Sequence, residues 1–561
     1  MNIALIDVNT ARVLGGGFSA QGSRLISALL KRAGHSVKLV FLTKYNPFTY
    51  SRAEIEQLHE ILKDIDLVMV AVFSTCARLA VQVTDFVHKK YPGMKVIWGG
   101  PHCIAAPEFS LRYADGVCFS EGDECVVDFV NKLETGNQDY LKTPNMAFNV
   151  NGSPVINKAL PPFEDLDSLP FTDYTLEDKF VLNESLSPLT KEKAADYYNT
   201  YAFAGQSLFM LTSRGCPHQC SYCNNCRYVS IFDKNHVRFH SVSRFMDELE
   251  AYMNYYGFFG GVGFSDDDFF LRPVDQLEEF AERYKKNVGI PFGVAVSPNT
   301  YRREKMEILL DAGMIAIEMG VQSASQRVLD EVYNRKVSIT KTREVTHQIA
   351  RYQETNRLAF VLDFIIDNPY EKRKDIIQTY RYLAGLPHKI LARVYNLVFF
   401  PGTPIYDRAV KDGVIAPYDV MKFRSLDDCY RGNILYQANY ETLLVFLAMR
   451  YRHRIPRWFT SLLGSYPVRI IASLVPKFII RRLLLKLLKF HRNIDGKIKL
   501  SSRSIKQGKD LSSHFFSRGL IYQMRGNKAR AIADFQECIR LNENPEVVEM
   551  AKRLVEENTA E

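Results

Sequence analysis

The first 135 residues alternate between short apolar runs and helical patterns, and this alternation restricts the fold more than any other feature. The apolar runs have the length of strands and cover residues 2–8, 36–42, 65–73, 94–100 and 114–120. Amphipathic helical patterns separate them, for example at residues 22–34 and 79–92. Strands that alternate with helices predict an α/β fold with a doubly wound parallel sheet. Ligands of such sheets bind beyond the carboxyl ends of the strands, here at residues 9–17, 74–77, 99–102 and 121–124.

A chain of 561 residues exceeds what one hydrophobic core holds, so several domains are expected. Its 47% hydrophobic and 24% charged residues are typical of globular proteins and exclude an intrinsically disordered chain. Residues 161–174 are rich in proline and acids, which indicates a surface linker. We predict five parts: a first α/β domain at 1–145, a linker at 146–200, a second α/β domain at 201–425, a basic helical region at 426–510 and a helical hairpin at 511–561.

The cysteine content and the N-terminal sequence favour a reducing cytoplasmic location. Ten cysteines in so long a chain do not resemble a secreted disulfide framework, and the opening MNIALIDVNT has no charged-then-apolar leader. The most apolar segment, residues 468–490, is interrupted by six Lys and Arg, which argues against a membrane span. Residues 450–509 hold sixteen Lys and Arg against one acid, Asp495, so the basic character is concentrated in one region.

Three cysteines are closely spaced in the stretch RGCPHQCSYCNN, at Cys216, Cys220 and Cys223. Structural zinc sites use four ligands, and disulfides do not suit a reducing compartment. Iron–sulfur clusters are held by closely spaced thiolates, and three donors leave one iron of a cubane open. Cys226 follows after a second two-residue gap, but a fourth thiolate would occupy that open iron. We therefore predict that Cys226 is a bystander or a thiol on the substrate side.

The Cys-x3-Cys-x2-Cys pattern, with Arg214, Gly215, Pro217 and Tyr222 beside it, resembles the signature of the radical S-adenosylmethionine (SAM) superfamily. The resemblance implies that the three cysteines ligate a 4Fe–4S cluster and that SAM occupies the open iron. It also implies an external reductant of the flavodoxin or ferredoxin type, whose electron cleaves SAM to a 5′-deoxyadenosyl radical. The cofactors carry this chemistry and the protein orients them.

The chain downstream of the cysteines resembles the partial (β/α) barrel of these enzymes. The matching segments are residues 260–271, 313–332, 357–380 and 392–409. The active site of such a barrel lies at the carboxyl ends of its strands. The resemblance implies SAM contacts from Tyr222, Asp267, Gln322 and Ser323. Gln322 stands where the family has glutamate, and the aspartates at 266–268 could instead form a solvated turn.

The first domain resembles the cobalamin-binding domain that precedes some radical SAM enzymes, on the stretch GGPHCIAAPEFSLRYADGVCFSEGDE at residues 99–124. The resemblance implies cobalamin contacts from Asn9, Ser74, Gly99, Gly100, Pro101, His102, Glu121 and Gly122. The alternative is that these are ordinary turn residues of an α/β domain. No histidine follows Asp7 at the Asp-x-His-x-x-Gly spacing, so we expect cobalamin to bind without a histidine ligand to cobalt. His35 and His102 are possible substitutes, although a lone histidine in a loop is more often structural.

The combined resemblance implies a cobalamin-dependent radical SAM enzyme, with methyl transfer to an unactivated carbon or phosphorus centre as the leading expectation. The same architecture also supports cyclisation, ring contraction and carbon–carbon bond formation. A non-catalytic module that senses cobalamin or redox state is the alternative of another class. The substrate is expected to be a small molecule or a lipid.

The basic C-terminal region is not explained by these cofactors. Lys477, Arg481, Lys486 and Lys489 recur at helical spacing beside an apolar stripe formed by Ile480, Leu483, Leu484, Leu487 and Leu488. This pattern favours a helix on an anionic membrane surface, with the inner face as the expected location and packing against the acidic remainder of the protein as the alternative. Nucleic-acid binding is disfavoured because aromatic residues are sparse here.

The last fifty residues resemble a single tetratricopeptide repeat. The matching residues are Gly519, Tyr522, Gly526, Ala531, Phe535 and Pro545. One repeat cannot bury its own apolar face. We therefore expect it to pack on the preceding helices or to dock a protein partner.

Overall fold

The computed structural model describes residues 1–8, 20–43, 50–183, 185–198, 206–233, 236–355, 358–418, 436–437, 439–454, 456–476, 478–480, 482–484, 515, 528–541, 548, 551–552 and 554–556. The chain divides into two compact units. The first comprises residues 1–437 and 447–465, and the second comprises residues 438–446 and 466–561.

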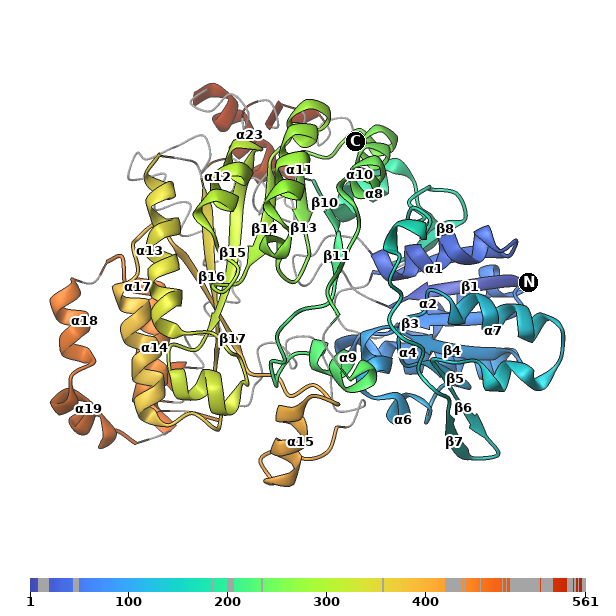
Figure 1. Ribbon diagram of the computed structural model, residues 1–561, viewed down its shortest axis with the longest axis horizontal. Helices are drawn as coiled ribbons and strands as arrows, with labels where there is room; N and C mark the ends of the chain where they lie inside the picture. The colour runs from blue at the N-terminus through green and yellow to red at the C-terminus, as the bar shows by residue number, and fades with distance from the viewer. Residues whose placement is uncertain are drawn as a thin grey trace. The chain divides into compact units, whose positions relative to one another are not determined.

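The first unit begins with a sheet whose centre is five parallel strands (Figure 1). These strands are β1 (Asn2–Asp7), β2 (Ser36–Leu42), β3 (Leu67–Ala71), β4 (Lys95–Gly99) and β5 (Gly116–Cys118). Their order in the sheet is β5-β4-β3-β1-β2, so the strand order reverses between β1 and β3. This is the doubly wound topology that the sequence predicted, and its switch point is the usual position of a ligand.

The helices of this domain follow from the predicted amphipathic patterns. They are α1 (Gln21–Arg32), α2 (Arg52–Glu56), α3 (His59–Leu62), α4 (Ala77–Lys90), α5 (Pro101–Ala105), α6 (Pro107–Ser110) and α7 (Cys125–Glu134). The apolar side of α4 (Leu79, Val83 and Val87) is buried in one core with β1 and β3. Burial of this surface against the sheet is the main source of stability for an amphipathic helix.

The segment 146–200, expected to be a linker, adds strands to both edges of this sheet. Strands β6 (Met146–Val150) and β7 (Ser153–Ile156) extend it antiparallel beyond β5. Strand β8 (Lys179–Leu182) pairs parallel with β2, and β9 (Leu186–Pro188) pairs antiparallel with β8. Helix α8 (Lys191–Tyr198) follows. The linker prediction is therefore wrong for most of this segment, because its residues form strands that pair with both edges of the sheet.

The acidic stretch at 161–174 is also not a surface linker throughout. Leu166 and Leu169 are buried with Leu29 of α1. The Asp173 carboxylate accepts hydrogen bonds from Ser27 Oγ at 2.7 Å and from the buried Lys179 Nζ at 2.7 Å. Arg24 Nη1 donates to the Asp173 carbonyl at 3.0 Å. This buried ionic cluster fixes the connector to α1 and β8.

The second sheet of the first unit has six parallel strands in the order β10-β13-β14-β15-β16-β17. The strands are β10 (Ser207–Met210), β13 (Gly261–Phe264), β14 (Phe292–Val296), β15 (Met314–Gln322), β16 (Ala359–Ile366) and β17 (Leu391–Asn396). Strands β10 and β17 are both edges, so the sheet is open, as expected for a partial barrel. The sequence analysis did not identify β14, whose residues FGVAV are short and rich in small side chains.

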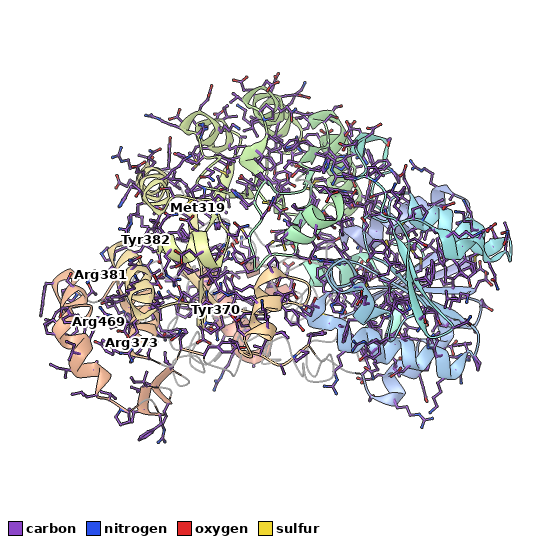
Figure 2. All side chains as sticks on the ribbon, turned by 60° about the horizontal axis from the view of Figure 1, so that its bottom comes forward. Met319, Tyr370, Arg373, Arg381, Tyr382 and Arg469 are labelled. Atoms are coloured by element: carbon purple, nitrogen blue, oxygen red, sulfur yellow. The ribbon has the colours of Figure 1, made fainter. Side chains whose placement is uncertain are left out.

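Helices cover one side of this sheet (Figure 1). They include α10 (Val242–Tyr256), α11 (Val274–Asn287), α12 (Arg303–Asp311), α13 (Ile339–Thr355) and α14 (Arg373–Gly385). Phe364 of β16 packs against Tyr382 of α14, with ring centroids 5.9 Å apart. Figure 2 labels Tyr382 together with Met319 of β15, which is fully buried. The helix-covered side of the sheet is thus an apolar core.

The remaining elements are helical. Helix α15 (Pro404–Lys411) and helix α18 (Arg457–Leu463) belong to the first unit, and helix α17 (Tyr440–Tyr451) contributes to both. The second unit also contains α19 (Tyr466–Ser473) and α23 (Lys528–Leu541). Ala531 and Phe535 of the predicted repeat are buried in α23, while Gly519, Tyr522, Gly526 and Pro545 lie outside the described residues. No helix among the described residues is long and apolar enough to cross a membrane.

Candidate functional site

The three cysteines lie in the loop that follows β10. Cys220 is buried, and Cys216 and Cys223 are partly exposed. Gly215 begins the loop with φ +92°, and a Cβ atom there would lie 1.8 Å from the carbonyl oxygen of His236. Only glycine fits so close an approach with a left-handed backbone. The local sequence therefore determines the path of the chain into the first cysteine.

A short antiparallel ribbon precedes and follows this loop. It pairs β11 (Ser213–Arg214) with β12 (Arg238–Phe239), and Arg214 lies opposite Arg238. Ser221, between Cys220 and Cys223, is also fixed, because its Oγ donates to the Val332 carbonyl at 2.7 Å. Helix α9 (Asn225–Phe232) continues from the loop. The loop is thus held before Cys216 and next to Cys220.

A buried arginine lies beside the cysteine loop. Arg335 Nη1 is 3.8 Å from Cys220 Sγ and 3.3 Å from Tyr222 Oη. Its Nη2 donates to the Gly320 carbonyl at 2.9 Å. A guanidinium at this distance stabilises a thiolate or an anionic cluster. The sequence analysis missed Arg335 because it is more than one hundred residues from the cysteines.

The cysteine loop is compatible with a cluster held by three thiolates. Within the described part of the chain, no three His, Cys, Asp or Glu side chains converge as the ligands of one ion would. A cubane needs only one thiolate for each iron, so the donors stand further apart. Burial raises the pKa of Cys216 and of Cys223 to about 12, so both thiols are protonated until iron displaces the proton.

The three aspartates after β13 have different surroundings. Asp266 is buried and accepts hydrogen bonds from Thr212 N at 2.5 Å and Ser213 N at 3.1 Å. Asp268 is buried and accepts from Thr300 Oγ1 at 2.7 Å. Neither belongs to a solvated turn, which was the alternative reading of this loop. Asp266 supports the start of the cysteine loop from beneath.

Asp267 alone of the three faces a cavity. Its carboxylate accepts a hydrogen bond from Asn225 Nδ2 at 2.8 Å. Burial raises the pKa of Asp267 to about 6. Such a group is a suitable partner for an amino or hydroxyl group of a ligand.

Gln322 and Ser323 lie at the carboxyl end of β15, away from the residues that line this cavity. Gln322 has φ +65°, and the pairing of β15 with β16 shifts register between Gly320 and Gln322. Ser323 is fully buried, and its Oγ donates to Glu371 Oε1 at 3.3 Å. The hydroxyl of Ser323 is thus engaged within the protein. Tyr222 likewise contacts Arg335 and does not line the cavity.

The cavity has a volume of about 580 Å³ and lies where the carboxyl edge of the first sheet meets the cysteine loop. Leu5 and Asp7 of β1 and Met69 of β3 place it at the topological switch point. Of the residues selected from the sequence, it is lined by Gly99, Gly100, Pro101, Glu121, Gly122, Cys216 and Asp267. One cavity therefore joins the two groups of residues that the sequence placed in separate domains.

Two of the glycines selected as cobalamin contacts, Gly99 and Gly100, lie at this cavity. Gly100 has φ +95°, and a Cβ atom there would be 3.1 Å from the backbone of Val72, so only glycine fits at this turn. The expected contacts from Ser74 and His102 are not found at its lining, and Asn9 lies outside the described residues. Ser74 Oγ instead lies 2.9 Å from His102 Nδ1.

Neither substitute histidine lies at the cavity. His102 is fully buried, and burial lowers its pKa to about 4. His35 contacts the N-terminal amine at 3.2 Å and Asn131 Oδ1 at 2.9 Å. Both are structural, which agrees with the absence of a histidine after Asp7. The described lining includes His236 and His240, which come from the second domain.

Two ion pairs join the domains beside the cavity. Arg214 Nη1 and Nη2 donate to Asp123 at 2.7 and 2.9 Å. Arg238 Nη1 and Nη2 donate to Glu121 at 2.9 and 2.7 Å, and Glu121 also accepts from Phe163 N at 2.9 Å. Glu121, selected as a ligand contact, therefore has a carboxylate already occupied by protein partners. Sequence analysis did not identify Asp123 or Arg238.

Comparison with protein families gives two matches along the chain. Residues 10–130 match the B12 binding domain, and residues 210–383 match the radical SAM superfamily. An uncharacterized methyltransferase from Pyrococcus horikoshii is 23% identical over 374 residues, which cover 66% of this chain and 75% of the relative. Cytidylyl-2-hydroxyethylphosphonate methyltransferase from Streptomyces wedmorensis is 24% identical over 183 residues, 32% of this chain and 31% of that enzyme.

Solved structures show the same fold. The radical SAM methyltransferase TsrM from Kitasatospora setae matches with a TM-score of 0.58 at 15% identity, covering 73% of this chain and 76% of that chain. The cobalamin-dependent SAM radical enzyme OxsB matches with a TM-score of 0.58 at 14% identity, covering 100% of this chain and 79% of that chain.

The two family matches follow the order of the two sheets, and the cysteine motif lies inside the second match. The retention of all three cysteines and of the glycine-lined cavity agrees with both. The chain is therefore a radical SAM enzyme with a B12 binding domain, and its cofactors are a 4Fe–4S cluster, S-adenosylmethionine and cobalamin.

Proposed function

We propose that this enzyme is a methyltransferase that acts on an unactivated carbon or phosphorus centre of its substrate. The observation that supports this proposal is the single cavity lined by Gly99, Gly100 and Gly122 on one side and by Cys216 and Asp267 on the other. When bound, the cluster and SAM supply a radical that removes a substrate hydrogen atom, and cobalamin supplies the methyl group. The curated relatives are named as methyltransferases, one of them acting on a phosphonate nucleotide.

The residues of this chain hold and orient the reacting groups. Cys216, Cys220 and Cys223 are the proposed cluster ligands, and Arg335 compensates the negative charge beside Cys220. Asp267 can accept a hydrogen bond from a SAM polar group, and Gly99 to Pro101 with Gly122 allow close approach of the corrin. Tyr222 contacts Arg335 as a positioning residue, and Gln322 and Ser323 follow Gly320, whose carbonyl accepts from the same Arg335, at the carboxyl end of β15.

The test is anaerobic reconstitution with iron, sulfide and cobalamin, followed by reduction in the presence of SAM that carries a trideuteromethyl group. A flavodoxin or ferredoxin type of reductant is expected to support turnover. Mass spectrometry of added acceptors should reveal the label in product together with 5′-deoxyadenosine. Production of 5′-deoxyadenosine with a rearranged, unlabelled product would instead favour a cyclase, ring-contraction or carbon–carbon bond-forming enzyme. No cleavage of SAM under any reducing condition would favour a sensing module.

A second observation concerns the location of the enzyme. Within the second unit, large apolar side chains of residues 466–483 are exposed, and Leu474 is 80% exposed. The exposed residues are Tyr466, Ile470, Ile471, Leu474, Val475, Phe478, Ile479 and Leu483. Exposed apolar surface of this extent marks an interaction site. The surrounding residues 450–509 contain sixteen Lys and Arg and one acid.

We infer that this segment attaches the enzyme to an anionic membrane surface, where a lipid substrate would be within reach. Apolar side chains enter the headgroup region while cations contact anionic lipids, each adding about 1 kcal/mol. The four predicted cations, Lys477, Arg481, Lys486 and Lys489, lie outside the described residues. Of the predicted apolar stripe, Leu483 is exposed and Ile480 and Leu484 are buried. The predicted repeat of α23 remains a candidate surface for a protein partner.

The test is sedimentation with liposomes that contain phosphatidylglycerol or only phosphatidylcholine. The wild-type protein should sediment with the anionic liposomes at low salt, and Ile471→Ser with Leu474→Ser should release it. Ile156→Ser is the matched control, because Ile156 is an exposed apolar residue on β7. Equal sedimentation of all three proteins would remove the membrane proposal and, with it, the preference for a lipid.

A further inference from the structure

The side of the second sheet that faces away from the helices carries charged residues in the middle of its strands. Side chains alternate between the two sides of a strand. On β15, Ile317 and Met319 are buried on the helix-covered side, and Glu318 between them points to the opposite side with 46% of its side chain exposed. Strand β15 is not an edge strand, so this exposure lies on the sheet face opposite the helices.

Glu318 belongs to a cluster of three charged residues from three adjacent strands. Arg393 of β17 donates from Nε and Nη2 to the two carboxylate oxygens of Asp363 on β16, both at 2.7 Å. The Glu318 carboxylate also contacts Arg393 Nη2. We call Glu318, Asp363 and Arg393 the acidic triad.

The acidic triad has two carboxylates and one guanidinium. The bidentate pair between Arg393 and Asp363 satisfies the charge of both groups. Glu318 shares the same guanidinium, so two ionised carboxylates carry one more charge than Arg393 compensates. Partial burial, followed by the contact with Asp363, raises the pKa of Glu318 to about 7, so a bound cation would favour its ionised form. With Glu318 ionised, a cationic group restores neutrality and an anionic ligand does not.

Small and apolar residues surround the acidic triad on the same side of the sheet. Ala295 of β14 lies opposite Glu318 in the parallel register. Gly293 is two residues before Ala295 and therefore lies on the same side of the strand. On the other side, Leu391 and Tyr395 flank Arg393 on β17 and are both exposed. Small side chains leave space over β14, and the Tyr395 ring, whose centroid is 5.9 Å from Arg393 Cζ, adds an aromatic surface beside the guanidinium.

The acidic triad lies on the amino-terminal side of the strand residues that connect to the cysteine loop. Gly320 follows Glu318 by two residues, about 7 Å along the strand. The Gly320 carbonyl accepts from Arg335, which contacts Cys220 Sγ at 3.8 Å. A substrate held at Glu318 would therefore extend toward the carboxyl end of the sheet, where the cysteines lie.

We propose that the acidic triad binds an ammonium or guanidinium group of the substrate and orients the rest of the molecule toward the cysteine loop. This inference rests on the proposed methyltransferase function, because it assigns the substrate of the same site. The other explanation, a purely structural ion cluster, predicts no ligand preference.

The test uses two probes of the same shape and opposite charge, 2-phenylethylammonium and 3-phenylpropanoate. Equilibrium dialysis against the anaerobically reconstituted holoenzyme should show at least tenfold tighter binding of the ammonium probe. Glu318→Gln should reduce that affinity about tenfold or more, and Glu354→Gln, an exposed acid on α13, should leave it unchanged. Ala295→Leu fills the space opposite Glu318 without changing charge and should also weaken binding.

Equal affinity for the two probes, or an unchanged affinity in Glu318→Gln with full iron content, would overturn the inference. If the Glu318→Gln variant fails to bind iron, the Ala295→Leu variant is used instead. Unchanged binding of the ammonium probe by Ala295→Leu would also overturn the inference. Reductive cleavage of SAM by the wild-type enzyme without any acceptor is measured in parallel. Its absence would count against the proposed function, while the binding result would still stand or fall on its own.

Discussion

Arg214, two residues before Cys216, forms a bidentate ion pair with Asp123 of the B12 binding domain, with distances of 2.7 and 2.9 Å. The same short stretch of chain thus leads into the cysteine loop and contacts the loop that lines the cavity. Its position makes the ion pair a structural connection between the two cofactor regions.

We expect Asp123→Asn to lower methyl transfer about 10- to 100-fold, because a displacement near 1 Å at a reacting centre has an effect of this order. Iron and cobalamin contents should stay near those of the wild type. Glu124→Gln, the exposed neighbour, is the matched control. Unchanged product formation in Asp123→Asn would show that the ion pair does not position the cofactors.

Replacement of Cys216, Cys220 and Cys223 by alanine should remove the cluster, because each thiol is a proposed ligand of one iron. The wild type should bind about four irons and the triple variant almost none. Cys226→Ala should retain full iron content. Iron analysis and ultraviolet–visible spectra of anaerobic samples measure both, and loss of iron in Cys226→Ala would assign that thiol to the cluster.

Cobalamin should bind without a histidine ligand to cobalt. His102 and His35 are engaged elsewhere, and no histidine follows Asp7 at the family spacing. His236 and His240 do line the cavity, but their Nδ1 atoms contact Glu164 and Asp167. Electron paramagnetic resonance of the Co(II) form should be identical in protein grown with ¹⁴N- or ¹⁵N-histidine. A change of the superhyperfine pattern on ¹⁵N labelling would identify a protein imidazole on the metal and contradict this expectation.

Asp173→Asn should destabilise the protein by about 3–5 kcal/mol, since it leaves the buried Lys179 without its anionic partner. Asp178→Asn, which removes an exposed acid from the same connector, is the control. Midpoints of urea unfolding followed by circular dichroism compare the variants. Equal midpoints would mean that the cluster adds nothing to stability.

The same carboxylate has a definite pH dependence. Burial alone would raise the pKa of Asp173, but Lys179 and the hydrogen bond from Ser27 outweigh it and lower the pKa below its ordinary value. A lowered pKa means that the stabilisation is present above the unfolded pKa near 4 and is lost only as the pH falls further. The wild type and Asp173→Asn should therefore converge in stability only under strongly acidic conditions.

The fold could be predicted from local patterns because the five central strands of the first sheet and all six of the second are parallel and are buried on the helix side. The runs at 2–8 and 36–42 became β1 and β2 almost without change. The residues at 146–200 were misread because an edge strand such as β7 is exposed and lacks an apolar run. Strand β14 was missed because its Gly293 and Ala295 leave space over the sheet instead of filling a core.

Site residues that belong to one contiguous motif were predicted. Site residues whose contacts join distant parts of the chain were missed. The cysteines, Asp267 and the glycines at 99 and 100 could be found in short stretches of sequence. Arg335, Arg238 and Asp123 act through partners about ninety or more residues away, a distance at which no local pattern signals a contact. His102 was selected by its position in a loop, but the structure buries it below the cavity lining.

The register of the β11–β12 ribbon has a mechanical consequence. Arg214 and Arg238 lie opposite each other across the ribbon and hold Asp123 and Glu121, which are two residues apart on one loop of the B12 binding domain. Attachment at one point would leave the domains free to swivel about it, whereas two neighbouring points resist rotation as well as separation. Opening of the enzyme at this place would require both ion pairs to break together, so exchange of a substrate is expected to take another route, such as the face of the second sheet opposite its helices.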